Sequence, residues 1–349
     1  GPAIRGDRGV HQGPHRSFIR LIVAHGGAIA ASLADCLGRF LGMFAFAIYT
    51  PHDGALFLAR DRLGIKPLFW GEQQNTFCFA SSARALLDLL PQRPALRTEA
   101  ISHYLSSIRV NMGSVTLLQD VNLLEPGHCL RVSSTGSLKI WPYWQPLALA
   151  PGDKPQRSME EATEILRSLL EDSVRLRLLS DVPLGGFLSG GLDSTIIAAL
   201  ATRQTNHHYH AYNVGYPQPG YNEFPYVQEA ADAYGMNCRQ IELDPNDYPA
   251  LWQFLVRQNG LPLSTPNEVP IYMLSKSLRQ DYTVALSGEG ADEILGGYTI
   301  AHFAGFDFER ASRSPLGDKP LTHVDRAIQR AYGQPHLPDL ATQHLLLNA

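Results

Sequence analysis

Cysteine is scarce in this sequence. The chain has 349 residues and 4 cysteines, Cys36, Cys78, Cys129 and Cys238. Their wide separation gives neither the short Cys-x-x-Cys pairs of a structural zinc site nor the dense framework of a small disulfide-stapled domain. The pattern therefore predicts reduced thiols in a protein core.

Long apolar runs and basic blocks are lacking as well. The apolar stretches fall far short of the roughly 20 residues that a membrane-spanning helix needs. Lys and Arg total 29 against 33 Asp and Glu, a net charge of −4, and no basic cluster suits a nucleic-acid surface. No cationic, apolar leader precedes the first predicted element. We therefore expect a cytoplasmic protein with neither a membrane nor a nucleic acid as partner.

The length suits two domains, each able to bury its own core. Residues 146–157 contain three prolines and no apolar periodicity, which is typical of a linker. We therefore expect one domain over residues 3–145 and a second over residues 158–349.

The first half reads as mixed strand and helix. Residues 20–41 predict a helix with its lead-in. The turn chemistry of residues 51–54 separates two β-rich runs and predicts a hairpin. Further expected elements are strand 77–81 with a helix after it, helix 98–105, and a second hairpin from 129–132 and 137–141.

The second half alternates helix and strand. Expected helices cover 159–179, 192–203, 223–234, 247–258 and 269–280. Expected strands cover 182–188, 209–215, 238–243 and 282–286. This alternation predicts a doubly wound parallel sheet, which binds ligands at the carboxyl ends of its strands.

A small-residue loop, Ser189-Gly-Gly-Leu-Asp-Ser194, follows the first of these strands and opens a helix. The free N–H groups of a helix start and the helix dipole attract an anion, and glycines let it approach closely. Asp193 repels bare phosphate, so a Mg²⁺ between the two would remove the conflict. The alternative is a plain glycine turn. The residues expected to supply backbone or hydroxyl donors are Ser189, Gly190, Gly191, Ser194 and Thr195.

A second loop, Ser287-Gly-Glu-Gly-Ala-Asp-Glu293, follows the last expected strand. Its three acids, Glu289, Asp292 and Glu293, would repel one another unless a cation or a substrate ammonium group lies among them. The alternative is an ordinary capping cluster before a helix.

Both loops resemble those of known enzymes. The 189–194 string is similar to the pyrophosphate loop of the ATP pyrophosphatases, and it lacks the Gly-Lys-Ser/Thr of a Walker loop. That loop alone would also suit synthetases for GMP, NAD and argininosuccinate. The 287–293 string resembles that of asparagine synthetases and favours this family. Residues 41–49, 58–69, 79–81 and 125–128 resemble, in order, the glutaminase domain of the same family.

The resemblance implies an α/β protein, with an N-terminal Ntn-hydrolase-like α+β sandwich followed by a doubly wound ATP-pyrophosphatase domain. It implies that ATP adenylates a carboxylate, most simply the aspartate β-carboxylate, with release of pyrophosphate. Ammonia then attacks the acyl-adenylate. The implied cofactors are ATP and Mg²⁺. The implied partners are a small-molecule carboxylate and ammonia, the latter from glutamine if a complete N-terminus exists; a homodimer is left open.

The same resemblance assigns roles to residues. Glu289 would orient the substrate and handle a proton as ammonia attacks. Asp193 and Asp292 would hold Mg²⁺. Phe187 and Val214 would line the adenine pocket, with main-chain contacts at Ser287 and Gly288.

The sequence departs from the family at its ends. The family's glutaminase uses an N-terminal cysteine whose own α-amino group is the general base, whereas residue 1 is Gly and the first cysteine is Cys36. The expected catalytic lysine segment is also absent, since the last lysine is Lys319. We therefore expect both domains to be incomplete and glutamine not to be hydrolysed by that route.

Three internal positions depart as well. Asn222, Asn259 and Cys238 stand where the family leads us to expect Asp, Asp and His. These changes leave open a specialised relative, such as a β-lactam synthetase or a lasso-peptide cyclase, that activates a different carboxylate. A catalytically inactive scaffold is the remaining alternative.

Overall fold

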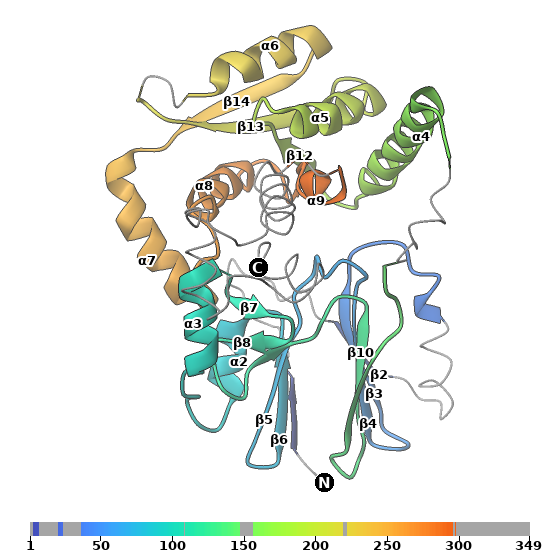
Figure 1. Ribbon diagram of the computed structural model, residues 1–349, viewed down its shortest axis with the longest axis vertical. Helices are drawn as coiled ribbons and strands as arrows, with labels where there is room; N and C mark the ends of the chain where they lie inside the picture. The colour runs from blue at the N-terminus through green and yellow to red at the C-terminus, as the bar shows by residue number, and fades with distance from the viewer. Residues whose placement is uncertain are drawn as a thin grey trace, which may run out of the picture. The chain divides into compact units, whose positions relative to one another are not determined.

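The structure is a computed structural model that describes residues 3–6, 20–23, 36–107, 109–146, 156–218, 222–295 and 297 (Figure 1). The chain divides into two compact units. One comprises Gly1–Gln156 and Asn246–Val269, and the other Arg157–Pro245 and Pro270–Ala349. The N-terminal unit therefore includes a segment from the second half of the chain. The expected boundaries at 146–157 stay a prediction, and Lys319 lies outside the described residues.

The first sheet of the N-terminal unit has the strand order β11-β10-β4-β3-β2. Its strands are β2 (Arg20–Val23), β3 (Ala45–Thr50), β4 (Ala55–Arg60), β10 (His128–Val132) and β11 (Leu138–Pro142). Both predicted hairpins are confirmed, because β3 pairs antiparallel with β4 and β10 with β11. The helical lead-in expected from residue 20 is wrong. Residues 20–23 form a strand parallel to β3, and such a pairing is invisible to local pattern.

The second sheet has the order β1-β6-β5-β9-β8-β7. Its strands are β1 (Ala3–Gly6), β5 (Phe69–Gln73), β6 (Thr76–Ala80), β7 (Asn111–Met112), β8 (Val115–Thr116) and β9 (Asn122–Leu123). A two-residue turn joins β5 to β6, with Gln74 and Asn75 at φ 47° and 62°. Positive φ at both turn residues matches the right-handed twist of a hairpin.

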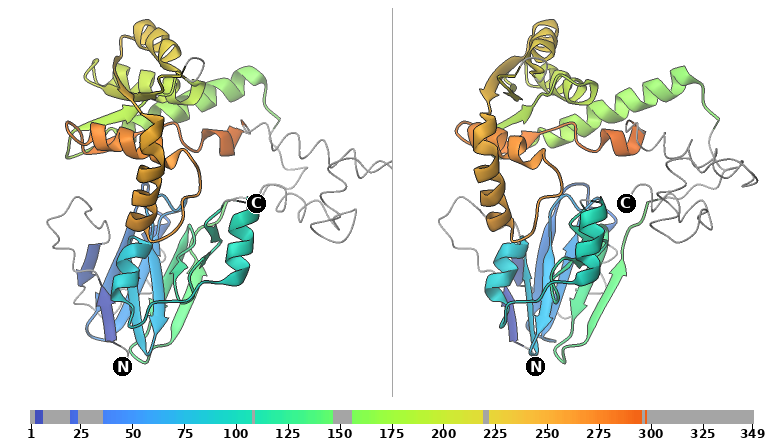
Figure 2. Two further views of the ribbon diagram at one scale, coloured as in Figure 1. Left: turned by 90° about the vertical axis from the view of Figure 1, so that its left-hand side faces the viewer. Right: turned by 60° about the vertical axis from the view of Figure 1, so that its left-hand side comes forward.

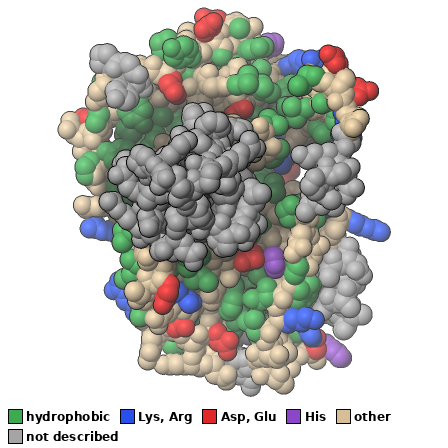
Figure 3. Space-filling model, viewed as in Figure 1, with side chains coloured by type: hydrophobic (Ala, Val, Ile, Leu, Met, Phe, Trp, Pro, Cys, Tyr) green, Lys and Arg blue, Asp and Glu red, His purple; other side chains and the backbone are tan. Residues whose placement is uncertain are grey.

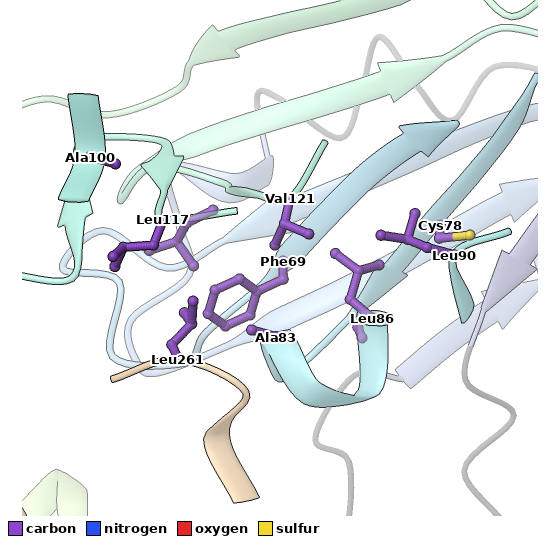
Figure 4. Packing of buried hydrophobic residues seen from close by; sticks show 11 residues of the cluster. Phe69, Cys78, Ala83, Leu86, Leu90, Ala100, Leu117, Val121 and Leu261 are labelled. Atoms are coloured by element: carbon purple, nitrogen blue, oxygen red, sulfur yellow. The ribbon is translucent and has the colours of Figure 1, made fainter. Parts of the chain in front are cut away.

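The two sheets pack face to face. Between them lie apolar side chains from both sheets and their loops: Ala45, Ala47, Leu56, Leu58, Leu68, Phe77, Phe79, Leu124, Leu130 and Val132. Helices α2 (Ala83–Leu89) and α3 (Thr98–Ser107) cover the outer face of the β5–β6 sheet, where Leu86 and Ala100 pack with Phe69 (Figure 4). Leu261, which follows α7 (Tyr248–Asn259), completes this cluster. The predicted α+β sandwich is confirmed (Figure 2).

Two buried charges hold the turn after β4. Arg60 is 6% exposed, and its guanidinium donates to the carbonyls of Gly64, Lys66 and Leu124. The Asp61 carboxylate is 1% exposed and accepts backbone N–H groups from Ile65 and Lys66 at 2.9 Å. Buried ions are tolerated only when such bonds surround them. The charged residues Arg60 and Asp61 therefore stabilise this turn, which explains why they occur inside an apolar stretch.

The C-terminal unit contains one parallel sheet in the order β14-β13-β12-β15. The strands are β12 (Leu184–Phe187), β13 (His210–Gly215), β14 (Asn237–Glu242) and β15 (Val284–Leu286). The helices among its described residues are α4 (Met159–Arg177), α5 (Leu192–Gln204), α6 (Phe224–Tyr234), α8 (Glu268–Leu278) and α9 (Ala291–Leu295). The predicted doubly wound parallel sheet is confirmed.

Helices cover both faces of this sheet. Val174, Ala198 and Val227, from α4, α5 and α6, pack with Leu188 and Ala211 on one face. Leu274 and Leu278 of α8 pack with Tyr212 on the other. No helix among the described residues is long and apolar enough to cross a membrane.

Apolar side chains also reach the surface of the C-terminal unit (Figure 3). Helix α4 begins with a capping box, in which Ser158 and Glu161 satisfy each other's backbone N–H. Its apolar stripe is only partly covered, since Val174 is 2% exposed but Leu169 is 63% and Met159 is 78% exposed.

Candidate active site

Strand order places the two glycine-rich loops at one edge of the sheet. From β12 the chain moves outward through β13 to β14, then crosses to β15 on the other side of β12. The connections therefore diverge between β12 and β15, and in doubly wound sheets the ligand crevice is expected at the carboxyl ends of such a strand pair. Ser189 comes shortly after β12 and Ser287 directly after β15, so both loops lie at the position of this expected crevice.

The two loops are in contact. A side chain at Gly288 would place its Cβ 2.8 Å from the backbone nitrogen of Ser194 and 3.0 Å from the carbonyl carbon of Asp193. Backbone atoms can relieve such an overlap only by a costly shift, so this position strongly favours glycine. The predicted residues Asp193, Ser194, Ser287 and Gly288 are thus brought together.

The first loop is shaped by its two serines. Ser194 is buried, and its Oγ lies 2.9 Å from the Oγ of Ser189, accepts the N–H of Ser189 and donates to the carbonyl of Gly191. The N–H of Gly191 donates to the Oγ of Ser189. When Ser194 donates to Gly191, Ser189 donates to Ser194, and both hydroxyl protons are used inside the loop. The role of these hydroxyls as donors to an anion stays a prediction.

The start of α5 supplies backbone donors instead. The residue before the helix, Gly191, has no side chain and makes no capping hydrogen bond. The first N–H groups of a helix have no partner within it, and the helix dipole adds positive charge at the same point. Gly190 adopts φ +82° and lies against the backbone nitrogen of Val227 at the start of α6, which fixes how the loop enters α5.

Acidic side chains border these donors. Asp193 lies in the first turn of α5 and Asp292 in the first turn of α9, and both are half-buried. Glu289 and Glu293 are exposed. The described residues contain no group of three or more His, Cys, Asp or Glu side chains arranged to hold a metal by themselves. Two carboxylates with substrate phosphates are, however, the donor set that Mg²⁺ prefers.

The predicted apolar residues lie on the α8 face. Phe187 and Val214 are half-buried and pack beside Tyr212, Leu274 and Leu278. Thr195 is half-buried in α5, where its N–H donates to the carbonyl of Gly191. All predicted site residues thus belong to the two loops or to the strands and helix next to them.

Asn213, which lies beside the first loop, was not singled out from the sequence. Asn213 is 3% exposed in the middle of β13, and its Nδ2 donates to the carbonyl of Leu188 at 2.9 Å. The signal was present in the sequence, because an asparagine interrupts the otherwise apolar run 211–214.

The three departures from the expected pattern fall in different places. Asn222 lies just before α6, and its Oδ1 accepts hydrogen bonds from the N–H of Phe224 and the Nε2 of Gln240, both at 3.0 Å. Cys238 packs with the apolar cluster under α6, and burial raises the pKa of its thiol to about 11. Asn259 ends α7, within the N-terminal unit.

The cysteines of the N-terminal unit do not form a reactive centre. Cys78 and Cys129 are fully buried, and burial raises the pKa of Cys129 to about 12, so its thiol stays protonated. Cys36 is exposed, contrary to the apolar environment expected for a core thiol.

Comparison with known families identifies the chain. Residues 28–144 match the model described as a glutamine amidotransferase domain. This match identifies an amidotransferase-type domain in the first half of the chain. Residues 165–345 match the model described as asparagine synthase. The chain belongs to the asparagine synthase family.

Individual relatives agree with this assignment. Asparagine synthetase [glutamine-hydrolyzing] 1 of Bacillus subtilis is 31% identical over 297 residues, which cover 85% of this chain and 44% of the relative. A putative asparagine synthetase [glutamine-hydrolyzing] of Mycobacterium bovis is 33% identical over 312 residues, covering 87% and 45%. The chain thus spans about half the length of the curated relatives it matches.

Among solved structures, the NH3-dependent NAD synthetase from Campylobacter jejuni aligns with a TM-score of 0.30 at 12% identity. The alignment covers 55% of this chain and 92% of that one. A likeness of this size carries no argument about function.

Proposed function

We propose that this protein is an ATP-dependent carbon–nitrogen ligase that adenylates a carboxylate, releases pyrophosphate and transfers ammonia to the activated acyl group. The observation that carries the proposal is the contact between the two loops, with Gly288 against Asp193 and Ser194. This contact puts an uncapped helix start and the acidic 289–293 segment at the same crevice. Activation of a carboxylate by ATP needs both anion donors and groups that handle the nucleophile.

The first half-reaction, adenylation, depends on binding the phosphates, the adenine ring and the metal ion of ATP. The N–H groups at the start of α5 would bind the β and γ phosphates, whose negative charge grows as pyrophosphate departs. Phe187 and Val214 would pack against the adenine ring. Asp193 and Asp292 would hold Mg²⁺, which, when bound, neutralises charge between the carboxylates and the phosphates.

The second half-reaction needs a base. Glu289 is exposed at the crevice, next to the glycine that touches the first loop. Its carboxylate would orient the ammonia and accept a proton as nitrogen attacks the acyl carbon. The substrate proposed first is aspartate, through its β-carboxylate.

Glutamine is a proposed source of ammonia, since residues 28–144 match a glutamine amidotransferase domain. Neither buried cysteine of this domain, Cys78 or Cys129, supplies a thiolate. Free ammonium should therefore support turnover of the chain as given.

The test is pyrophosphate release from ATP with ammonium and either aspartate or a panel of other small carboxylates. We expect release that depends on one carboxylate, together with its amide. The Asp193→Ala variant should lose ATP–pyrophosphate exchange while keeping a wild-type circular dichroism spectrum, because Asp193 binds metal and does not pack. Exchange at a near-normal rate in this variant would show that the metal assignment is wrong. A preference for a carboxylate other than aspartate would favour the alternative that the protein is a specialised member of the family that activates a different carboxylate.

A further inference from the structure

A buried asparagine lies where the sheet of the C-terminal unit opens. Asn213 of β13 is 3% exposed and lies on the face that packs under α5 and α6 with Ala211. Buried side-chain amides normally find partners for both ends. Here only Nδ2 has one, the carbonyl of Leu188 at 2.9 Å, while the buried Oδ1 has none.

The carbonyl of Leu188 is the point at which the β12–β13 ladder stops. Phe187 is paired with Tyr212, and the N–H of Leu188 still donates to the carbonyl of Tyr212 at 2.9 Å. In a regular parallel ladder the next bond would run from the N–H of Val214 to the carbonyl of Leu188. That carbonyl instead accepts the Asn213 side chain, and the hydrogen bonds of the described residues include none between Val214 and Leu188.

The peptide groups of Val214 are left facing the crevice. Successive residues of a strand direct their N–H and C=O groups to alternate sides, and those of Tyr212 face β12. Those of Val214 therefore face β12 as well, but beyond the end of its ladder. Val214 thus presents an N–H donor beside a C=O acceptor. This pair is complementary to adenine, which offers an acceptor (N7) beside a donor (N6–H₂). Guanine offers two acceptors on that edge.

We propose that Asn213 is a positioning residue: its side-chain amide ends the β12–β13 ladder and so keeps the peptide groups of Val214 free to read the nucleobase. The unpartnered Oδ1 supports this. A buried acceptor without a donor destabilises a folded protein, so an apolar side chain of similar shape would pack better here. The hydrogen bond from Nδ2 to the carbonyl of Leu188 explains why an amide side chain occupies this position. The inference rests on the proposed use of ATP.

The test uses the Asn213→Leu variant, in which the side-chain volume is nearly kept and both the donor and the unpartnered acceptor are removed. The N–H of Val214 should then bond to Leu188. We expect its hydrogen exchange, followed by NMR without nucleotide, to become slow in the variant and to be fast in the wild type. The KM for ATP should rise roughly tenfold, the effect of one or two lost hydrogen bonds. The KM for the carboxylate and kcat should not change by a comparable factor. The thermal midpoint should not fall.

A matched control is Asn237→Leu. Asn237 also donates Nδ2 to a backbone carbonyl, that of His207 at 3.5 Å, but at the amino end of β14, away from the crevice. This variant should leave the exchange of Val214 and the KM for ATP unchanged.

Two results would overturn the proposal. One is a Val214 amide that already exchanges slowly in the nucleotide-free wild type. The other is an Asn213→Leu variant that loses stability while its KM for ATP stays normal, which is the sign of a purely structural residue. Failure of the proposed function would look different, with no ATP turnover on any carboxylate. Slow exchange in the variant would then still support the ladder-ending role, and the nucleobase role would be wrong.

Discussion

Single residues set how closely the two loops approach. Gly288 has no side chain where its neighbours are the backbone atoms of Asp193 and Ser194. Ser194 is buried and bonded within its own loop, so the proposed anion donors are backbone groups, which hold their direction better than a rotating hydroxyl. The proposed chemistry at this crevice therefore depends on how closely the two loops pack.

Gly288→Ala should separate the two loops. The added Cβ would lie at 2.8 Å and 3.0 Å from backbone atoms, so the loops must shift by several tenths of an ångström. We expect pyrophosphate release to fall by at least tenfold, because misplacement of catalytic groups by even a fraction of an ångström is costly. Steady-state kinetics measure this. Gly290→Ala is the control for added bulk, since nothing lies within 4 Å of a Cβ there. Its φ of +97° makes some loss of stability expected, but activity equal in the two variants would contradict the role of the contact.

Glu289→Gln should separate the two half-reactions. The amide keeps the shape of the side chain but cannot accept a proton, so ATP–pyrophosphate exchange should persist while amide formation drops by about 10²-fold or more. Isotope exchange and product chromatography on the same samples give the two rates. An equal loss of both would indicate a role in binding metal or in holding the loop.

At the level of helices and strands, the buried residues Arg60 and Asp61 at the end of β4 show that charged side chains can stabilise a turn. Arg60 ties its own turn to the carbonyl of Leu124, which precedes β10. The pKa of Arg60 is lowered by burial, but an arginine remains charged at any physiological pH. Its three acceptors stay satisfied only while that guanidinium is in place.

Arg60→Met should lower the free energy of unfolding by about 3–5 kcal/mol, because removal of one member of a buried polar network leaves the others without partners. The matched control is Arg84→Met. Arg84 forms only an exposed pair with Asp88 one helical turn away, so its loss should change stability by less than about 0.5 kcal/mol. Urea denaturation followed by tryptophan fluorescence measures both. Similar midpoints for the two variants would show that the Arg60 network is not important for stability.

Most elements could be predicted from the sequence, and the elements that were missed are short or depend on residues far along the chain. The four strands of the C-terminal unit and its helices α4, α5, α6 and α8 were all expected, whereas the short helix α9 was not. The strands β7, β8 and β9 have two residues each, too few for any pattern. Strand β2 was mistaken for part of a helical region because its pairing with β3 depends on residues that lie far along the chain.

The site shows the same division. Both loops could be located from their residues, because glycines and acids after an apolar strand have few other uses. That Gly288 touches Asp193 could not be predicted, since it depends on β15 lying next to β12. Asn213 was missed because its role depends on the register of β13 against β12, which no local pattern specifies.

On the scale of the whole molecule, we propose that the C-terminal unit activates a carboxylate by adenylation. The family match and the meeting of the two loops both support this chemistry, and it differs from the other common route through an acyl phosphate. The two routes break different bonds of ATP. Adenylation transfers one carboxylate oxygen to AMP, whereas phosphorylation transfers it to inorganic phosphate.

The most direct measurement is therefore the fate of ¹⁸O from a doubly labelled carboxylate, aspartate first, incubated with the protein, ATP, Mg²⁺ and ammonium. The account predicts pyrophosphate and AMP as products, with one ¹⁸O in each AMP by mass spectrometry, and an amide that keeps the other label. Label in inorganic phosphate, with ADP as the nucleotide product, would contradict the account.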